Sequence, residues 1–137
     1  MRVVLDTTVL VAGLRSRNGA SFALLRLLRE GRWTLVLSNT ALAEYEEVLK
    51  REHALWGLSL EEVDRLLDAI CLLAERRQVY SQWIPVLPDP GDEPFAHLAW
   101  DADVDCIVTH NRRHFEPMSR IGIEVLAPSE LLRLVRS

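Results

Sequence analysis

Short apolar runs alternate with longer amphipathic segments along the chain. The apolar runs at residues 2–5, 33–37, 105–109 and 123–126 have the length expected of buried strands. An extended segment at residues 79–87 is the candidate for a further strand, which would be the third in chain order. The sequence therefore indicates a sheet whose strands are separated by other elements rather than by short hairpin turns.

The segments between these strands carry apolar residues three or four positions apart, as in helices with one buried face. Ser38 is suited to cap one of them, and Ser59 with Glu62 has the sequence of a capping box. Because strands alternate with helices and no repeat or linker interrupts them, we expect one α/β domain over residues 1–137, a three-layer αβα sandwich with a parallel sheet. The expected helices cover residues 8–14, 21–30, 38–51, 59–73, 92–101 and a last segment that begins at Ser129.

The composition is that of a globular protein, with 49% hydrophobic and 26% charged residues. No apolar stretch reaches the length of a membrane-spanning helix, and the first residues lack the pattern of a signal peptide. We therefore expect a cytoplasmic protein with no membrane partner. The residues Cys71 and Cys106 lie far apart in apolar segments, which indicates free thiols rather than a disulfide framework.

The net charge of −4 argues against a chain coated with positive charge for tight, non-specific binding of nucleic acid. Arginines nevertheless gather locally, at residues 15–17, 26–32 and 112–113, while Lys50 is the only lysine. These clusters are compatible with a basic rim around an acidic site, although a solvated surface also explains any single arginine. The four histidines lack the spacing of zinc ligands.

Asp6 carries the strongest chemical signal in the sequence. It ends the apolar run of residues 3–5, so its carboxylate is expected at the carboxyl end of a buried strand, where ligands bind in open α/β sheets. A lone carboxylate in that position is costly unless something pairs with it. Asp6 therefore requires a partner, and a metal ion is the leading candidate.

Two further acidic residues are expected near the same edge of the sheet. Glu44 is expected in the first turn of the helix after the second strand, and Asp92 in the first turn of the helix after the turn at residues 88–91. Right-handed crossovers bring the carboxyl ends of parallel strands to one edge, so both can reach the crevice of Asp6. Clustered carboxylates need a cation among them, and hard oxygen ligands select Mg²⁺ or Mn²⁺. This pattern predicts metal-assisted hydrolysis of phosphodiesters.

Every acidic residue except Asp6 also has a purely structural interpretation. Glu44 is compatible with a surface charge on an amphipathic helix, and Asp92 with the favourable dipole at a helix start. Asp89, which precedes Pro90, is compatible with a turn or an N-cap. Spacing in the sequence does not decide between these interpretations and a metal site.

Four segments of the chain together resemble the motifs of the PIN-domain family. Their order and spacing cover nearly the whole sequence, and the similarity is greatest to the VapC-like toxins of prokaryotic toxin–antitoxin systems. The segments are residues 3–11 (VVLDTTVLV), 38–49 (SNTALAEYEEVL), 89–99 (DPGDEPFAHLA) and 105–111 (DCIVTHN).

The resemblance implies a five-stranded parallel sheet, frequent homodimers and an endoribonuclease that uses Mg²⁺ or Mn²⁺. The acidic positions of the family correspond to Asp6, Glu44 and Asp92, which are thereby implied as metal ligands and catalytic residues. Thr109 matches a strand-end threonine that assists the water or carboxylate network. Asn111 stands at a fourth position that is often Asp; it would orient water or the metal, but it removes a charge.

The resemblance also implies binding partners. The substrate would be RNA, single-stranded or looped rather than duplex, and a cognate antitoxin would occupy the groove of the active site. Arginine suits bidentate contact with phosphate, and four arginines follow the ends of strands or the first helix. The residues expected to contact the RNA backbone are Arg15, Arg17, Arg112 and Arg113.

Two alternative functions remain open from the sequence. A PIN-like module that binds nucleic acid or protein without efficient catalysis is compatible with Asn111 and with Thr8, which replaces the asparagine usual in the family. A small phosphatase is less compatible, because the haloacid-dehalogenase type carries a second Asp two residues after the first, where this chain has Thr8. The sequence also lacks a suitably placed late lysine.

Overall fold

A five-stranded, all-parallel sheet forms the centre of the computed structural model, which describes residues 1–80, 85 and 87–136. The strand order is β3-β2-β1-β4-β5, so β1 lies in the middle of the sheet. The predicted α/β fold with a parallel sheet is confirmed. The strands are β1 (Arg2–Leu5), β2 (Thr34–Leu37), β3 (Glu75–Arg76), β4 (Cys106–Val108) and β5 (Glu124–Leu126).

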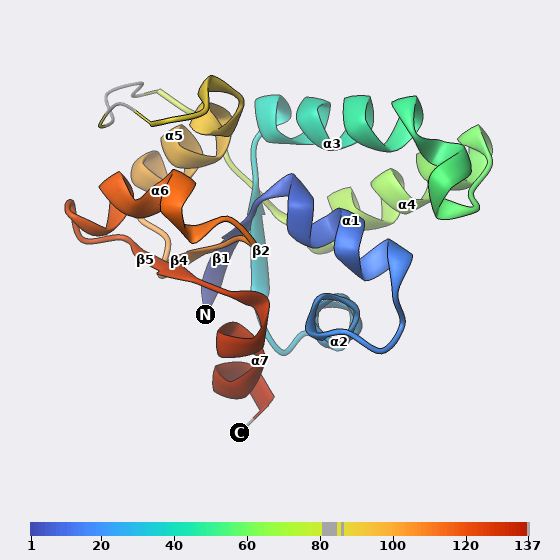
Figure 1. Ribbon diagram of the computed structural model, residues 1–137, viewed down its shortest axis with the longest axis horizontal. Coiled ribbons are helices and arrows are strands. Elements are labelled where there is room, and N and C mark those ends of the chain that lie inside the picture. Colours follow the sequence, from blue (N-terminus) through green and yellow to red (C-terminus); the bar gives the residue numbers. More distant parts are fainter. Residues whose placement is uncertain (81–84, 86, 137) are drawn as a thin grey trace.

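Helices cover both sides of the sheet. Figure 1 shows α1 to α4 to the right of β1 and β2, and α5 and α6 to the left, while α7 packs against α2. None of the helices in the described part of the chain is long and apolar enough to cross a membrane. The helices are α1 (Thr7–Arg15), α2 (Ala20–Arg29), α3 (Asn39–Arg51), α4 (Leu60–Leu73), α5 (Glu93–Asp101), α6 (Arg112–Ser119) and α7 (Pro128–Arg136), with 3₁₀ turns η1 (His53–Trp56) and η2 (Pro90–Asp92).

The apolar runs of the sequence form the core because they fall on the central strands. In β1 and β2, the residues 3–5 and 35–37 are at most 1% exposed. The predicted helix starts are also confirmed. Ser38 Oγ accepts a hydrogen bond from the Ala41 amide at 3.1 Å, and Ser59 and Glu62 form both bonds of a capping box. Strong local signals thus place the ends of α3 and α4.

The third strand does not lie where the sequence predicts it. β3 consists of Glu75 and Arg76, which pair with residues 36–37 of β2. Of the predicted strand at 79–87, the described residues 79, 80, 85 and 87 form no strand, and residues 81–84 and 86 lie outside the described residues. The prediction is wrong because β3 is a short polar edge strand, which apolar alternation does not reveal.

Helix α6 was also absent from the sequence-based prediction. Its sequence, RRHFEPMS, contains Pro117 inside the helix and only two buried apolar residues, Phe115 and Met118. Such a short, charged segment has no sustained helical periodicity, so the pattern of apolar residues does not indicate it. This helix matters for the site, because it carries His114.

Candidate metal centre

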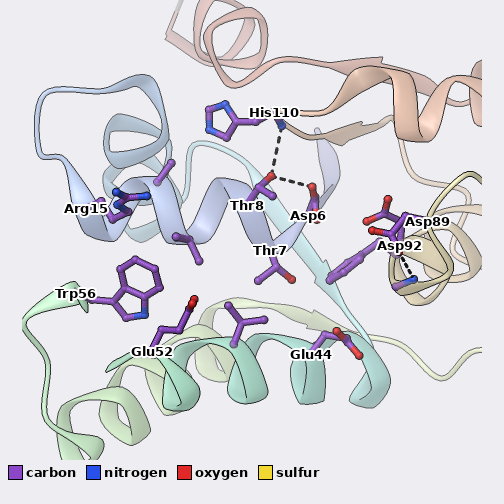
Figure 2. A pocket seen from close by; sticks show the side chains of 15 residues that line it. Asp6, Thr7, Thr8, Arg15, Glu44, Glu52, Trp56, Asp89, Asp92 and His110 are labelled. Atoms are coloured by element: carbon purple, nitrogen blue, oxygen red, sulfur yellow. Dashed lines mark hydrogen bonds between the residues drawn. The ribbon is translucent and has the colours of Figure 1, made fainter. Parts of the chain in front are cut away.

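A cleft of about 660 Å³ opens at the carboxyl edge of the sheet, between α1, α3 and α5. The three acidic residues singled out by the sequence, Asp6, Glu44 and Asp92, all line it. Asp6 follows β1, Glu44 lies in the second turn of α3 rather than in its first, and Asp92 ends η2. Figure 2 shows Glu44 on α3, across the cleft from Asp6 and Asp92. Residues far apart in the sequence therefore converge on one space.

Asp6 is held in place by two threonine hydroxyls. The side chain is 4% exposed, and its Oδ2 accepts hydrogen bonds from Thr8 Oγ1 at 2.8 Å and from Thr109 Oγ1 at 2.7 Å. Its backbone amide donates to the carbonyl of Val108 at 3.0 Å, which extends the pairing of β1 with β4. The carboxylate does not cap helix α1. Its orientation is thus set by hydroxyl groups on one oxygen.

Tyr45 fixes the end of strand β1, next to Asp6. Its hydroxyl donates a hydrogen bond to the carbonyl of Leu5 at 2.7 Å, and its ring stacks on Phe95 at a centroid distance of 5.8 Å. Burial raises the pKa of this hydroxyl far above its usual value, and the carboxylate of Asp6 adds to the shift. Tyr45 therefore stays protonated and fixes the end of β1 against α3 and α5.

Asp92 is a buried carboxylate without a hydrogen-bond donor for one of its oxygens. The residue is 9% exposed, and the buried atom Oδ2 has no hydrogen-bond partner in the described structure. The ring atom Nδ1 of His114 lies 3.3 Å from Oδ2, close enough for an ion pair but without hydrogen-bond geometry. Burial, followed by the carboxylates of Asp6 and Asp89, raises the pKa of Asp92 to about 6, and His114 opposes the shift. A cation beside Oδ2 would stabilise the ionised form of the Asp92 carboxylate.

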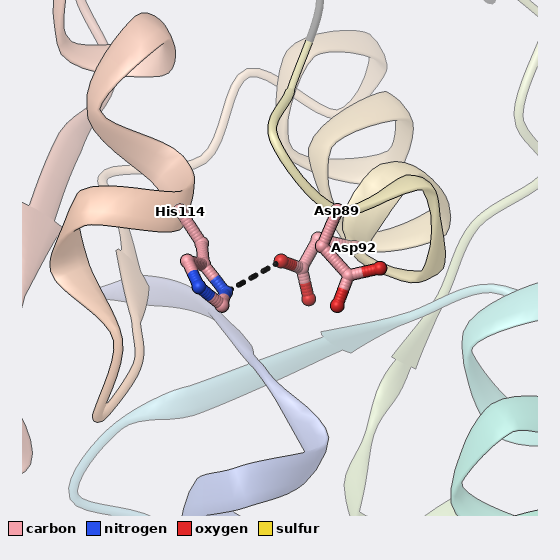
Figure 3. A group of neighbouring side chains, drawn as sticks. All are labelled: Asp89, Asp92 and His114. Atoms are coloured by element: carbon pink, nitrogen blue, oxygen red, sulfur yellow. Dashed lines mark ion pairs between the residues drawn. The ribbon is translucent and has the colours of Figure 1, made fainter.

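Asp89, Asp92 and His114 form a cluster with the geometry of a metal site. One possible ligand atom from each lies within 4.8 Å of the others, as Figure 3 shows. Asp89 also accepts a hydrogen bond from the Gly91 amide at 2.9 Å, so its side chain stabilises the turn as well. The sequence did not indicate Asp89 or His114 as possible ligands. Asp89 stood in the third motif and was interpreted only as a turn residue, whereas His114 gave no spacing signal.

This acidic cluster is able to bind a divalent cation. The donors are hard carboxylate oxygens and one imidazole nitrogen, and the oxygen of Asp92 left without a hydrogen bond lies among them. After burial, the negative charges of Asp6 and Asp89 raise the pKa of Asp92, and a cation at this place would offset their effect. Asp92 belongs both to this cluster and to the cleft of Asp6 and Glu44. The residues present therefore fit a metal ion.

The other predicted site residues lie at different distances from this centre. Thr109 contacts Asp6 directly. Asn111 is exposed and does not line the cleft, although its backbone amide donates a hydrogen bond to Thr109 Oγ1 at 3.0 Å. Its neighbour His110 does line the cleft, and its Nε2 lies 3.2 Å from Ser21 Oγ. Asn111 thus stands at the rim rather than inside.

The four predicted arginines separate into three groups. Arg15 lines the cleft at the end opposite Asp6, Asp89 and Asp92, with its guanidinium 5.8 Å from the ring centroid of Trp56, and Glu52 lines the cleft beside Trp56. Arg17 lies in a groove between α2 and α7. Arg112 and Arg113 line another groove, and Arg112 pairs with Glu130 at 2.7 Å. The structure brings only Arg15 into the cleft of the acidic residues.

The PIN-domain family model matches residues 2–113, which include all three acidic residues of the cleft. The chain belongs to the PIN-domain family. The match ends just before His114, so this histidine lies outside the shared segment. No curated protein sequence matches the chain significantly.

Solved structures of VapBC proteins share the fold of this chain. VapBC from Salmonella typhimurium bound to DNA superposes with a TM-score of 0.65 at 17% identity, covering 93% of this chain and 98% of that one. VapBC2 from Rickettsia felis bound to a promoter DNA fragment superposes with a TM-score of 0.60 at 18% identity, covering 92% of this chain and 97% of that one. VapBC-1 from nontypeable Haemophilus influenzae superposes with a TM-score of 0.60 at 15% identity, covering 94% of this chain and 99% of that one. At these identities, the likeness concerns the fold alone.

Proposed function

We propose that this PIN-domain protein is a metal-dependent endoribonuclease that hydrolyses phosphodiester bonds of RNA. The observation that carries the proposal is the convergence of Asp6, Glu44 and Asp92 on one cleft, with a buried oxygen of Asp92 left without a hydrogen bond. Membership in the PIN-domain family, shown over residues 2–113, supports the same chemistry. A cleft that gathers carboxylates around an unsatisfied oxygen suits a cation-assisted reaction better than simple binding.

Asp6, Glu44 and Asp92 would hold Mg²⁺ or Mn²⁺ in this proposal, with Asp89 and His114 as further ligands. A divalent ion in such a site neutralises phosphate charge and lowers the pKa of water. Thr109 and Thr8 orient the carboxylate of Asp6 through their hydroxyl groups.

Asn111, at the rim of the cleft, would orient water or the metal through its side-chain amide. This role requires the side chain to turn inward, because Asn111 is exposed and outside the lining of the cleft. His110, the preceding residue, reaches the cleft in the present conformation.

The RNA strand would enter the cleft along α1. Arg15 lies at the far end of this helix from Asp6, about 13 Å away at the helical rise of about 1.5 Å per residue. The ring of Trp56 holds the guanidinium by a cation–π contact, which leaves its donors available for a phosphate. A cleft of about 660 Å³ at the edge of the sheet suits single-stranded or looped RNA. Arg17, Arg112 and Arg113 would contact only RNA that extends beyond the cleft.

The proposed biological role is that of the toxin of a toxin–antitoxin pair. The basis is the similarity in fold to the VapBC structures and the VapC-like motifs of the sequence. A cognate antitoxin would then cover the acidic cleft, and a homodimer is the expected assembly. Co-expression with the product of a neighbouring small gene, followed by co-purification, tests the partner.

A nuclease assay tests the proposed activity. The purified protein is incubated with a panel of RNAs in Mn²⁺, in Mg²⁺ and in excess chelator, beside the variants Asp6→Asn and Glu47→Gln. Glu47 lies on the exposed side of α3 and serves as the control. We expect cleavage by the wild type and by Glu47→Gln, and none in chelator or by Asp6→Asn. Cleavage by Asp6→Asn at the wild-type rate would refute the assignment of the site.

One observation favours a second candidate, a PIN-domain module that binds RNA or protein without efficient catalysis. The family position that is often acidic is Asn111 here, and its side chain is exposed outside the cleft. In that case, the wild type would neither bind Mn²⁺ in a calorimetric titration nor cleave any RNA in the panel. Binding of Mn²⁺ with cleavage excludes this alternative.

A further inference from the structure

A second groove, of about 410 Å³, lies between α2 and α7, apart from the acidic cleft. Figure 1 shows these two helices side by side, and they pack against each other. The groove is lined by Arg17 from the loop before α2, by Arg26 from α2 and by Arg136 from the end of α7. We call it the arginine groove. All three arginines are exposed to solvent.

Among the described residues, no carboxylate forms an ion pair with the arginines of this groove. In the part of the chain that the structure describes, neither Arg17, Arg26 nor Arg136 forms an ion pair. Elsewhere in the same structure, arginines such as Arg51, Arg65 and Arg120 pair with a glutamate. The first turn of α2 also contains no acidic residue. The groove thus gathers three arginines that have no ion-pair partner among the described residues, in a chain with a net charge of −4.

The loop after α1 connects the acidic cleft to the arginine groove. Arg15, the last residue of α1, lines the cleft, and Arg17 lines the groove. The two residues are separated only by Ser16, so their Cα atoms are at most about 7 Å apart. A polymer that leaves the cleft at Arg15 therefore reaches the arginine groove without crossing an acidic surface of the connecting loop, whose residues are Ser16, Asn18 and Gly19.

We propose that the arginine groove binds the phosphate backbone of the RNA strand that extends from the cleft. The inference rests on the proposed function, since the substrate in the cleft is taken to be RNA. A polyanion is the occupant that three unpaired guanidinium groups attract, and guanidinium matches phosphate in a bidentate geometry. The contacts do not depend on base identity, so the groove adds affinity and length dependence rather than sequence preference.

Binding measurements in excess chelator test the proposal, because RNA is then not cleaved. The fluorescence anisotropy of a labelled uridine trinucleotide and of a long oligouridylate is followed over a range of salt concentrations. The test variant is Arg26→Gln with Arg136→Gln, and the matched control is Arg65→Gln with Arg120→Gln. The control residues are exposed and lie on α4 and after α6, outside the groove. Thermal unfolding verifies that both double variants are folded.

The test variant is expected to bind the long RNA more weakly than the wild type and the control do. Loss of two phosphate contacts to a single strand reduces the slope of log K against log salt by about 1.4, which corresponds to a loss of about 25-fold in affinity at about 0.1 M salt. The trinucleotide, which fills only the cleft, should bind alike to all three proteins. An unchanged slope and affinity for the long RNA in the test variant would overturn the proposal and leave the groove to a protein partner.

The measurements separate this inference from the proposed enzymatic function. If the wild type cleaves RNA in Mn²⁺ while the test variant keeps the wild-type salt slope, the arginine groove is refuted and the nuclease stands. If the slope falls but no RNA is cleaved in Mn²⁺, the groove stands and the nuclease is refuted. Absence of any RNA binding by the wild type in chelator refutes the arginine groove, and absence of cleavage in Mn²⁺ refutes the nuclease.

Discussion

Thr109 donates its hydroxyl hydrogen to the carboxylate of Asp6 across 2.7 Å, although the two residues are 103 positions apart in the chain. The contact exists because β1 and β4 are neighbours, with Leu5 opposite Val108 in the register. Both strands end at the same level, so the next residue of each meets the other. The pairing of two strands thereby sets the orientation of the central carboxylate of the site.

Thr109→Val is expected to slow RNA cleavage without unfolding the protein. Valine keeps the shape of the side chain but removes the donor to Asp6. A hydrogen bond to a charged group contributes about 1.5–3 kcal/mol, so we expect a loss of about 10- to 150-fold in rate. Cleavage is measured at saturating Mn²⁺, with Thr34→Val on β2, outside the cleft, as the control. A wild-type rate for Thr109→Val would show that Asp6 does not depend on this bond.

Asp92 is expected to make the stability of the metal-free protein depend on pH. Its pKa is raised from 3.8 to about 6, chiefly by burial and then by Asp6 and Asp89. A carboxyl group with a higher pKa in the folded state favours folding while it is protonated. Its contribution is therefore complete below pH 3.8 and is lost as the pH rises through about 6.

Urea unfolding in chelator, from pH 4 to pH 7, measures this effect as the difference between the wild type and Asp92→Asn. The wild type should lose stability relative to the variant as the pH rises, so that the variant is the more stable protein at neutral pH. The same variant should bind metal more weakly. A difference between the two proteins that does not change with pH would contradict the assigned environment of Asp92.

Mn²⁺ is expected to raise the melting temperature of the wild type and to have little effect on Glu44→Gln. A ligand that binds only the folded state stabilises it by about 2.7 kcal/mol at about 100 times its dissociation constant. Glu44 lines the cleft, whereas Glu47 on the same helix is exposed outside it, so Glu47→Gln is the matched control. Thermal unfolding at increasing Mn²⁺ gives the shift. Equal shifts in the wild type and in Glu44→Gln would exclude Glu44 as a ligand.

Arg2 is expected to contribute to stability far from the cleft. Its guanidinium binds both carboxylate oxygens of Glu75, at 3.0 and 2.6 Å, and donates to the carbonyl of Ala102 at 2.7 Å. It thereby ties the short edge strand β3 and the loop before β4 to β1. Arg2→Gln should cost about 1–2 kcal/mol at neutral pH in chemical unfolding.

The effect of Arg2→Gln should shrink in acid. The hydrogen bond from Arg2 lowers the pKa of Glu75 below 4.5, so the pair contributes above that pH and its contribution is lost as the pH falls further. Arg65→Gln, at an exposed pair on α4, serves as the control and should change stability little. A penalty for Arg2→Gln that stays constant in acid would show that its bond to the Ala102 carbonyl, rather than Glu75, is the main contact.

The prediction from sequence succeeded where the signal was local. The start of α3 was predicted from Ser38, and the start of α4 from Ser59 with Glu62, because a helix cap is formed by residues a few positions apart. It failed at β3, where two polar residues pair with β2, and at α6, which has only two buried apolar residues. Those two elements are stabilised by contacts with residues distant in the chain, so the local sequence does not indicate them.

The same distinction holds for the candidate site. The alternation of apolar runs with amphipathic helices was enough to indicate the parallel α/β fold, and a strand-end carboxylate was enough to single out Asp6. The resemblance to the PIN-domain motifs implied Thr109 and Asp92 as site residues. The contacts of Thr109 with Asp6 and of His114 with Asp92 depend on folding, because these residues lie on separate elements. Contacts between distant residues follow from strand order and helix packing, and so His114 and the arginine groove became recognisable only once the chain was folded.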